Sequence, residues 1–262
     1  MRVLVGLLAV SSALGQVDLS RLHALYGEPV REMFAATPDV RVVVSYAASR
    51  NANSLEITPA KQDSFIPDDV LDRILDQMIP PSMRGVMGQY GELVMSRVSN
   101  RSTDYENVSI SRLMTASQVT RAIVLLKPSF GDRNALFFRA LYGQPIAEGF
   151  SPRTDVGMTV SHSPGRMPCA LEIRPVSDAP FVPDDVLDGL LEEAVPVSTR
   201  GAKLDDLYTI NGHAGQNFTE YAFVSITRLI HMPGLVHTKL LGGATALVQY
   251  KTQECEAGEP LK

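Results

Sequence analysis

Short runs of alternating apolar and polar residues predict the first strands of this chain. Every even position from 40 to 45 is Val, and residues 156–160 alternate in the same phase. A period of two is typical of a strand with one buried face. Each run is followed by a turn-rich stretch and a second apolar segment, around residues 55–57 or 171–173. We therefore predict a hairpin in each half of the chain.

Apolar residues spaced three and four apart predict a helix in each half. Residues 67–78 begin Pro-Asp-Asp and carry one apolar stripe, and residues 183–194 repeat that pattern. Acids in the first turn suit the positive end of the helix dipole. A further helix in each half should end at a Tyr-Gly pair, where Gly27 or Gly143 suits a left-handed cap.

The two halves are copies of one another. Leu25–Pro29 (Leu-Tyr-Gly-Glu-Pro) recurs 116 positions later as Leu141–Pro145, with Gln for Glu. The same offset carries Phe65–Asp72 onto Phe181–Asp188, with Val for Ile. We therefore predict one repeat unit over residues 16–130 and a second over 131–262. Residues 1–15, before the first unit, are predicted to be a signal peptide for the reasons given below.

The last predicted strands complete the expected unit. They cover 107–114 and 120–127 in the first half, and 223–230 and 245–251 in the second. The elements predict an α+β fold made of two tandem copies of an α-β-β-α-β-β unit, with helices packed on one face of an antiparallel sheet.

The amino terminus predicts export. One positive charge at Arg2 is followed by a short apolar segment and by small residues at Ala13 and Gly15. This segment is too short for a permanent membrane helix, and no later stretch approaches eighteen apolar residues. We expect a mature chain starting near Gln16, without a membrane span, in a secreted or periplasmic location.

The cysteines leave two interpretations open. In an oxidising compartment Cys169 and Cys255 can form a bridge that ties the carboxy-terminal tail to the second repeat. Alternatively, Cys169 lies in a strand-like segment and is simply buried.

Composition excludes one class of partner. The net charge is -5 and no run of Lys or Arg forms a basic stripe, so we expect no nucleic-acid partner.

The sequence also contains no Gly-x-Ser-x-Gly elbow, phosphate-binding glycine loop or paired zinc histidines. The acids of the two Pro-Asp-Asp helices are explained by the dipole. We therefore expect no catalytic residues, metal or cofactor.

Positions that differ between the copies are the candidates for binding. The divergent segment of the second unit gathers polar residues that include Asn211 and His213, and His162 stands where the first unit has Tyr46. Variable loops on a constant scaffold are where recognition usually lies. We take His162, Asn211 and His213 as candidate binding residues, and drift in unimportant loops is the competing explanation.

The repeated motifs resemble a group of secreted bacterial tandem-repeat proteins of unknown function. They are Tyr-Gly-x-Pro, a Val-rich strand, Leu-Glu-Ile-x-Pro, Pro-Asp-Asp-Val-Leu-Asp and Arg-Gly. A second similarity, to the tandem units of β-lactamase-inhibitor-like modules, depends on the Leu-Tyr-Gly-x-Pro helix end and on the strands that follow it. The first resemblance implies export and assigns no activity.

We expect a non-enzymatic exported binding or scaffold module with an unknown protein or small-molecule ligand. The alternatives are an enzyme with its site in the groove between the repeats, and a secreted protein inhibitor. Convergent polar groups with shifted pKa values in that groove would favour a functional site there.

Overall fold

The fold is given by a computed structural model, which describes residues 19–62, 64–131, 133–165, 167–176, 182–211, 214–231, 243–252 and 255. The elements of the first unit are α1 (Leu19–Tyr26), β1 (Arg31–Thr37), β2 (Val40–Tyr46), β3 (Ala52–Pro59), α2 (Asp68–Met78), α3 (Pro81–Arg84), β4 (Met87–Met95), β5 (Val98–Tyr105), β6 (Val108–Thr115) and β7 (Gln118–Leu126). A 3-10 turn, η1 (Pro128–Phe130), leads to the second unit.

The second unit repeats this series of elements. They are α4 (Ala135–Tyr142), β8 (Ala147–Arg153), β9 (Val156–His162), β10 (Pro168–Pro175), β11 (Val182–Pro183), α5 (Asp184–Ala194), α6 (Val197–Arg200), β12 (Lys203–Asn211), β13 (Ala214–Tyr221), β14 (Val224–His231) and β15 (Gly243–Tyr250).

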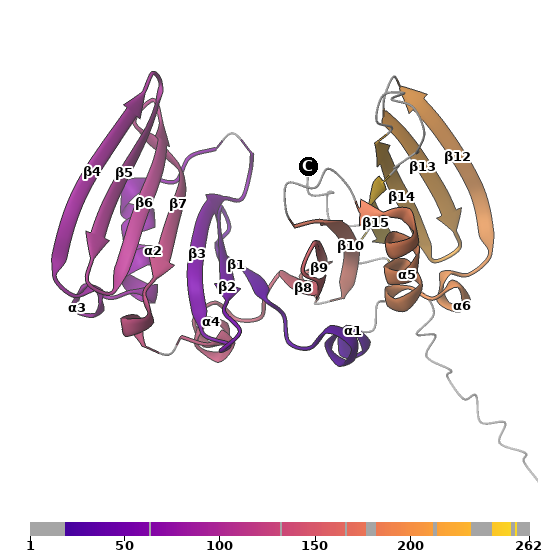
Figure 1. Ribbon diagram of the computed structural model, residues 1–262, viewed down its shortest axis with the longest axis horizontal. Helices are drawn as coiled ribbons and strands as arrows, with labels where there is room; N and C mark the ends of the chain where they lie inside the picture. The colour runs from indigo at the N-terminus through magenta and orange to yellow at the C-terminus, as the bar shows by residue number, and fades with distance from the viewer. Residues whose placement is uncertain are drawn as a thin grey trace, which may run out of the picture.

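All fifteen strands of the described residues belong to one antiparallel sheet that runs through both units (Figure 1). The order is β12-β13-β14-β15-β10-β9-β8-β1-β2-β3-β7-β6-β5-β4, with β11 paired to β15. Read outward from the centre, both units have the same arrangement. The pairing of β1 with β8 joins them, and the hairpins β4–β5 and β12–β13 form the two ends.

The predicted α+β fold of two α-β-β-α-β-β units is wrong, because a single large β-sheet dominates the protein. The strands that were predicted do exist, but three described strands of the first unit (β1, β4 and β5) and four of the second (β8, β11, β12 and β13) were missed. The innermost strands, β1 and β8, place Glu32 and Glu148 at buried positions and so break the apolar alternation. In the outer strand β4 every residue is exposed, so no buried face marks its sequence.

The core positions that the sequence predicted are buried in both units. In the first unit these are Val40, Val42, Val44, Leu55, Ile57, Leu71, Leu75, Val108 and Ile110. Their counterparts are Val156, Met158, Val160, Leu171, Ile173, Leu187, Leu191, Val224 and Ile226. The hairpin registers also agree, since Val42 pairs with Ile57 as Met158 pairs with Ile173. The duplicated sequence therefore builds two equivalent cores.

The first helix of each unit packs on the other unit. Leu22 of α1 lies in the second core together with Phe150, whereas Phe138 of α4 lies in the first core against Phe34. Leu22 and Phe138 are equivalent positions of the repeat. In Figure 1 the indigo α1 lies beside the second unit and the salmon α4 beside the first. Neither core is complete without a helix from the opposite half of the sequence.

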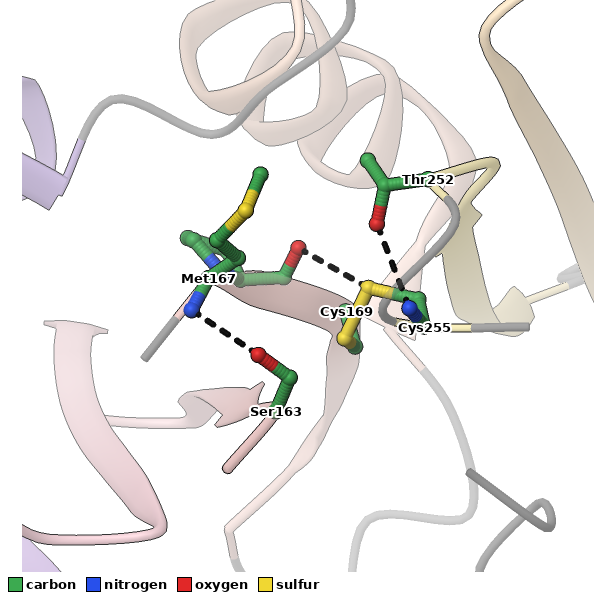
Figure 2. Close-up of a disulfide and its surroundings, with 6 residues drawn as sticks. Ser163, Met167, Cys169, Thr252 and Cys255 are labelled. Carbon is green, nitrogen blue, oxygen red and sulfur yellow. Dashed lines mark hydrogen bonds between the residues drawn. A yellow bond between two sulfur atoms is a disulfide. The ribbon is translucent and has the colours of Figure 1, made fainter. Parts of the chain in front are cut away.

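The two cysteines form a disulfide. Cys169 in β10 and Cys255 after β15 are bridged, with their Cα atoms 5.3 Å apart (Figure 2). The amide of Cys255 donates to Thr252 Oγ1 at 3.3 Å, and nearby the amide of Met167 donates to Ser163 Oγ at 3.1 Å. Of the two interpretations of the cysteines, the bridge is therefore correct. Such bridges persist in oxidising compartments.

No helix in the described part of the chain is long and apolar enough to cross a lipid bilayer. The expected signal peptide and the mature end at Gln16 lie outside the described residues.

Candidate functional site

Two buried carboxylates face each other where the units meet. Glu32 of β1 pairs directly with Glu148 of β8 in the ladder that joins the units. The residues are 0% and 7% exposed. Two negative charges that lie side by side and out of contact with water repel one another, so they need compensating groups.

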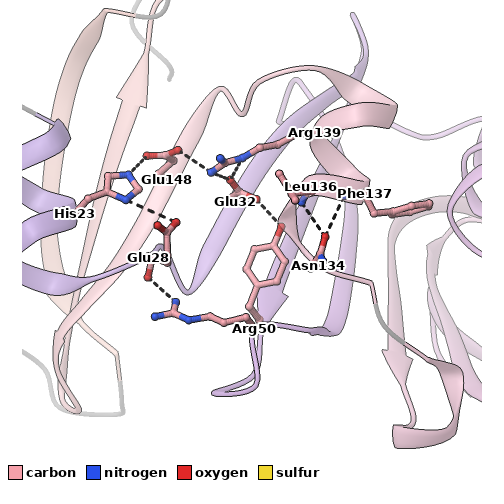
Figure 3. Close-up of polar contacts among 10 residues, drawn as sticks. His23, Glu28, Glu32, Arg50, Asn134, Leu136, Phe137, Arg139 and Glu148 are labelled. Carbon is pink, nitrogen blue, oxygen red and sulfur yellow. Dashed lines mark hydrogen bonds and ion pairs between the residues drawn. The ribbon is translucent and has the colours of Figure 1, made fainter.

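Arg139 of α4 supplies the main compensation (Figure 3). Its Nε donates to Glu32 Oε1 at 2.7 Å, and its Nη2 forms ion pairs with Glu32 and, at 3.5 Å, with Glu148. Burial opposes the charge on Arg139, but the hydrogen bond and the attraction of the two acids outweigh it and raise its pKa. One guanidinium therefore serves both carboxylates.

Tyr46 and His23 complete the cluster. The Tyr46 hydroxyl donates to Glu32 Oε2 at 2.5 Å, and burial together with this bond raises the pKa of Tyr46. His23 of α1 places Nε2 3.3 Å from Glu148 Oε2 and packs edge-on against Phe150. Glu28 lies on the far side of the ring, 3.8 Å from Nδ1.

The cluster uses equivalent positions of the two units, but the base is His in one unit and Arg in the other. His23 and Arg139 are equivalent positions, as are Glu32 and Glu148. Each acid is paired with a base on the first helix of the opposite unit, so these contacts fix the exchanged helices. Protein groups already contact the carboxylate oxygens, and this junction cluster (His23, Glu32, Tyr46, Arg139 and Glu148) links the two units.

His162, a candidate from the sequence, borders the junction cluster. It ends β9, and its amide donates to the Ile146 carbonyl at 2.9 Å. Both ring nitrogens are buried, and neither forms a hydrogen bond of good geometry in the described structure. The Pro145 carbonyl and Glu148 lie near enough to favour protonation of the ring. Burial has the larger influence and lowers the pKa of His162.

The other two candidates do not join His162. Asn211 ends β12, at the far end of the sheet, and four strands separate β12 from β9. His213 lies outside the described residues.

Sequence reasoning missed Glu32, Glu148, Arg139 and His23. A signal was present, because Glu32 and Glu148 keep one acid at the same repeat position just after the Tyr-Gly-x-Pro motif. The retained acid points to the junction only once the segments that carry Glu32 and Glu148 are known to be strands.

We expect replacement of His162 to alter how stability depends on pH. Since the folded pKa is lowered, the unfolded chain takes up the proton first as the pH falls through about 6.5. The contribution to stability is therefore complete above that pH and decreases below it. His162→Tyr, which copies Tyr46, should lose less stability between pH 7.5 and 5.5 than the natural protein in urea denaturation. An equal loss in both proteins would contradict a buried neutral His162.

The terminal hairpins are the other candidate surface. β4 and β12 end the strand order, so each has a paired neighbour on one side only among the described strands. In the first unit, apolar side chains at least 59% exposed line β4 and the residue before it: Val86, Met87, Tyr90, Leu93, Val94 and Met95. In β12, Leu204, Leu207, Tyr208 and Ile210 are at least 50% exposed. Long, exposed, apolar edges are sites of strand pairing.

Two hollows lie in the outer half of the first unit. The larger, about 420 Å³, is lined mainly by Thr, Pro and polar residues, with Lys61 as its one charged lining residue. The smaller, about 270 Å³, is lined by three arginines and two tyrosines among its seven residues.

No model of a known protein family matches this chain, and no curated protein is detectably similar to it. The resemblance to secreted tandem-repeat proteins therefore stays a prediction. The described residues also contain no group of three or more His, Cys, Asp or Glu side chains placed to hold a metal ion.

Proposed function

We propose that this protein is an exported, non-enzymatic binding module that captures a protein partner at its terminal hairpins. The main support is β4, in which every residue is exposed although the strand is nine residues long and rich in apolar side chains. A soluble protein normally shortens, charges or covers such an edge. A partner strand that adds to β4 or β12 would satisfy the free backbone groups and bury these side chains.

The junction supports a scaffold role better than catalysis. Arg139 forms ion pairs with both buried acids, His23 contacts Glu148, and Tyr46 occupies a further oxygen of Glu32. A catalytic acid or base must reach a substrate proton. Export agrees with the Cys169–Cys255 bridge and with the expected signal peptide.

Introducing charge on β4 should abolish capture of the partner. We expect the double substitution Leu93→Lys and Val94→Lys to weaken recovery of partner protein from the native extracellular fraction by at least about tenfold, since a buried, unpaired Lys is costly. Both side chains are more than 60% exposed, so stability should change by less than about 1 kcal/mol.

Leu136→Lys is the matched control, because Leu136 is also exposed but lies on α4. Equal recovery by the β4 variant and this control would contradict the proposal. If the partner is a second copy of this chain, sedimentation velocity of the purified protein will show a dimer that the β4 variant loses.

A further inference from the structure

The smaller hollow lies on the helix-bearing face of the first terminal hairpin. Arg84 comes from α3, Tyr90 from β4, Arg101 from β5 and Arg112 from β6, and the buried Ile110 is a further lining residue. Thr103 and Tyr105 complete the lining. Three positive side chains, and no acidic one, therefore line a space of about 270 Å³.

The acids that pair with these arginines lie outside the lining. Arg84 pairs with Asp76 at 2.5 Å and Arg112 with Asp72 at 2.6 Å, both on α2. Arg101 pairs with Glu92 through Nε at 2.9 Å, and among the described contacts its two terminal nitrogens have no other acceptor. Each guanidinium is thus held on one side and keeps N–H groups for a further acceptor.

Arg101 stands between an acid and a base in the sheet, because Glu92 is its direct partner in the β4–β5 ladder. Arg101 also stands directly opposite Arg112 in the β5–β6 ladder, and like charges in that relation destabilise a sheet. In the second unit the same rung joins Asn217 to Arg228, which removes the repulsion.

Two of the three arginines belong to a frame of ion pairs that both units share, and Arg101 does not. Arg200 pairs with Glu192 and Arg228 with Asp188, as Arg84 and Arg112 pair with acids on α2. These two arginines therefore belong to the common frame. Tyr90 and Arg101 are specific to the first unit, because Asp206 and Asn217 hold their places in the second.

We propose that this hollow binds a small organic oxyanion, a carboxylate or a phosphate monoester, whose apolar part packs on Tyr90 and Tyr105. Convergent arginines suit both anions, since the guanidinium presents parallel N–H donors to paired oxygens. The two aromatic rings and Ile110 give the apolar part of the ligand a wall. Tyr90 belongs both to this site and to the exposed side chains of β4, but the arginines come from α3, β5 and β6, so anion binding does not depend on capture of a partner at the edge.

Calorimetric titration of the full chain with benzoate and with phenyl phosphate tests this site, with benzamide as the uncharged probe. We expect saturable binding of at least one anion and none of benzamide. Tighter binding of benzoate would identify the natural ligand as a carboxylate, and tighter binding of phenyl phosphate as a phosphate monoester. Arg101→Asn, which copies the second unit, should weaken that binding about tenfold, the value of one charged hydrogen bond.

Arg121→Asn is the matched control. Arg121 is 44% exposed and pairs with Glu56 at 2.8 Å, and Arg101 is 47% exposed with a similar pair, so both variants lose the same charge. Affinity should stay within about twofold in the control, since exposed charges act weakly at a distance. Absence of saturable anion binding, equal binding of benzamide, or equal weakening in both variants would overturn the proposal.

Discussion

Replacing Arg139 with Ala should lower the free energy of unfolding by about 3–5 kcal/mol, because two buried carboxylates lose their shared counter-charge. Glu32 is fully buried and Glu148 nearly so, so water cannot take over the role of the guanidinium. Urea denaturation followed by circular dichroism measures the loss. Arg153→Ala is the control, since Arg153 and Asp155 are both about half exposed and their pair should contribute less than about 1 kcal/mol.

A double-mutant cycle shows whether the charge on Glu32 causes this loss. In a Glu32→Gln background, Arg139→Ala should cost clearly less, because the neutral amide leaves no unpaired charge. If Arg139→Ala costs the same in both backgrounds, the arginine acts by packing alone and the electrostatic explanation is wrong.

Replacing Phe138 with Ala should destabilise the first unit, although Phe138 belongs to the sequence of the second. The side chain is 1% exposed and packs against Phe34 and Tyr46, so truncation should cost about 3–5 kcal/mol. Hydrogen exchange should accelerate in β1 and β2 more than in β8 and β9.

Leu136→Ala on the same helix is the control, since that side chain is 71% exposed and its loss should cost less than about 0.5 kcal/mol. The equivalent substitution Leu22→Ala should loosen β8 and β9 instead. Faster exchange confined to each residue's own unit would show that the helices are not exchanged.

Local patterns were enough to find much of the structure. The Val alternation gave β2 and β9, and the apolar stripes gave α2 and α5, because these elements bury one regular face. The patterns failed where burial does not follow polarity. Glu32 is polar but buried, and Leu93 is apolar but exposed, so β1 and β4 lack the usual signature.

The junction cluster depends on contacts between distant parts of the chain. His23 meets Glu148, and Arg139 meets Glu32, only because the first helices cross to the opposite unit. A repeat comparison can show that both acids are retained, but it does not predict that exchange. His162 was chosen for its difference from Tyr46, and it does border the cluster through Glu148.

Site-specific photo-cross-linking shows whether the open edges of the sheet hold a protein partner. A photo-reactive residue is placed at Leu93 in β4, at Leu207 in β12 or at Leu136 in α4, all of them exposed. Each protein is then irradiated in the native extracellular fraction. We expect a discrete cross-linked partner from position 93 or 207 and none from 136. Cross-linking no stronger at the two edge positions than at position 136 would contradict the proposed capture at the edges.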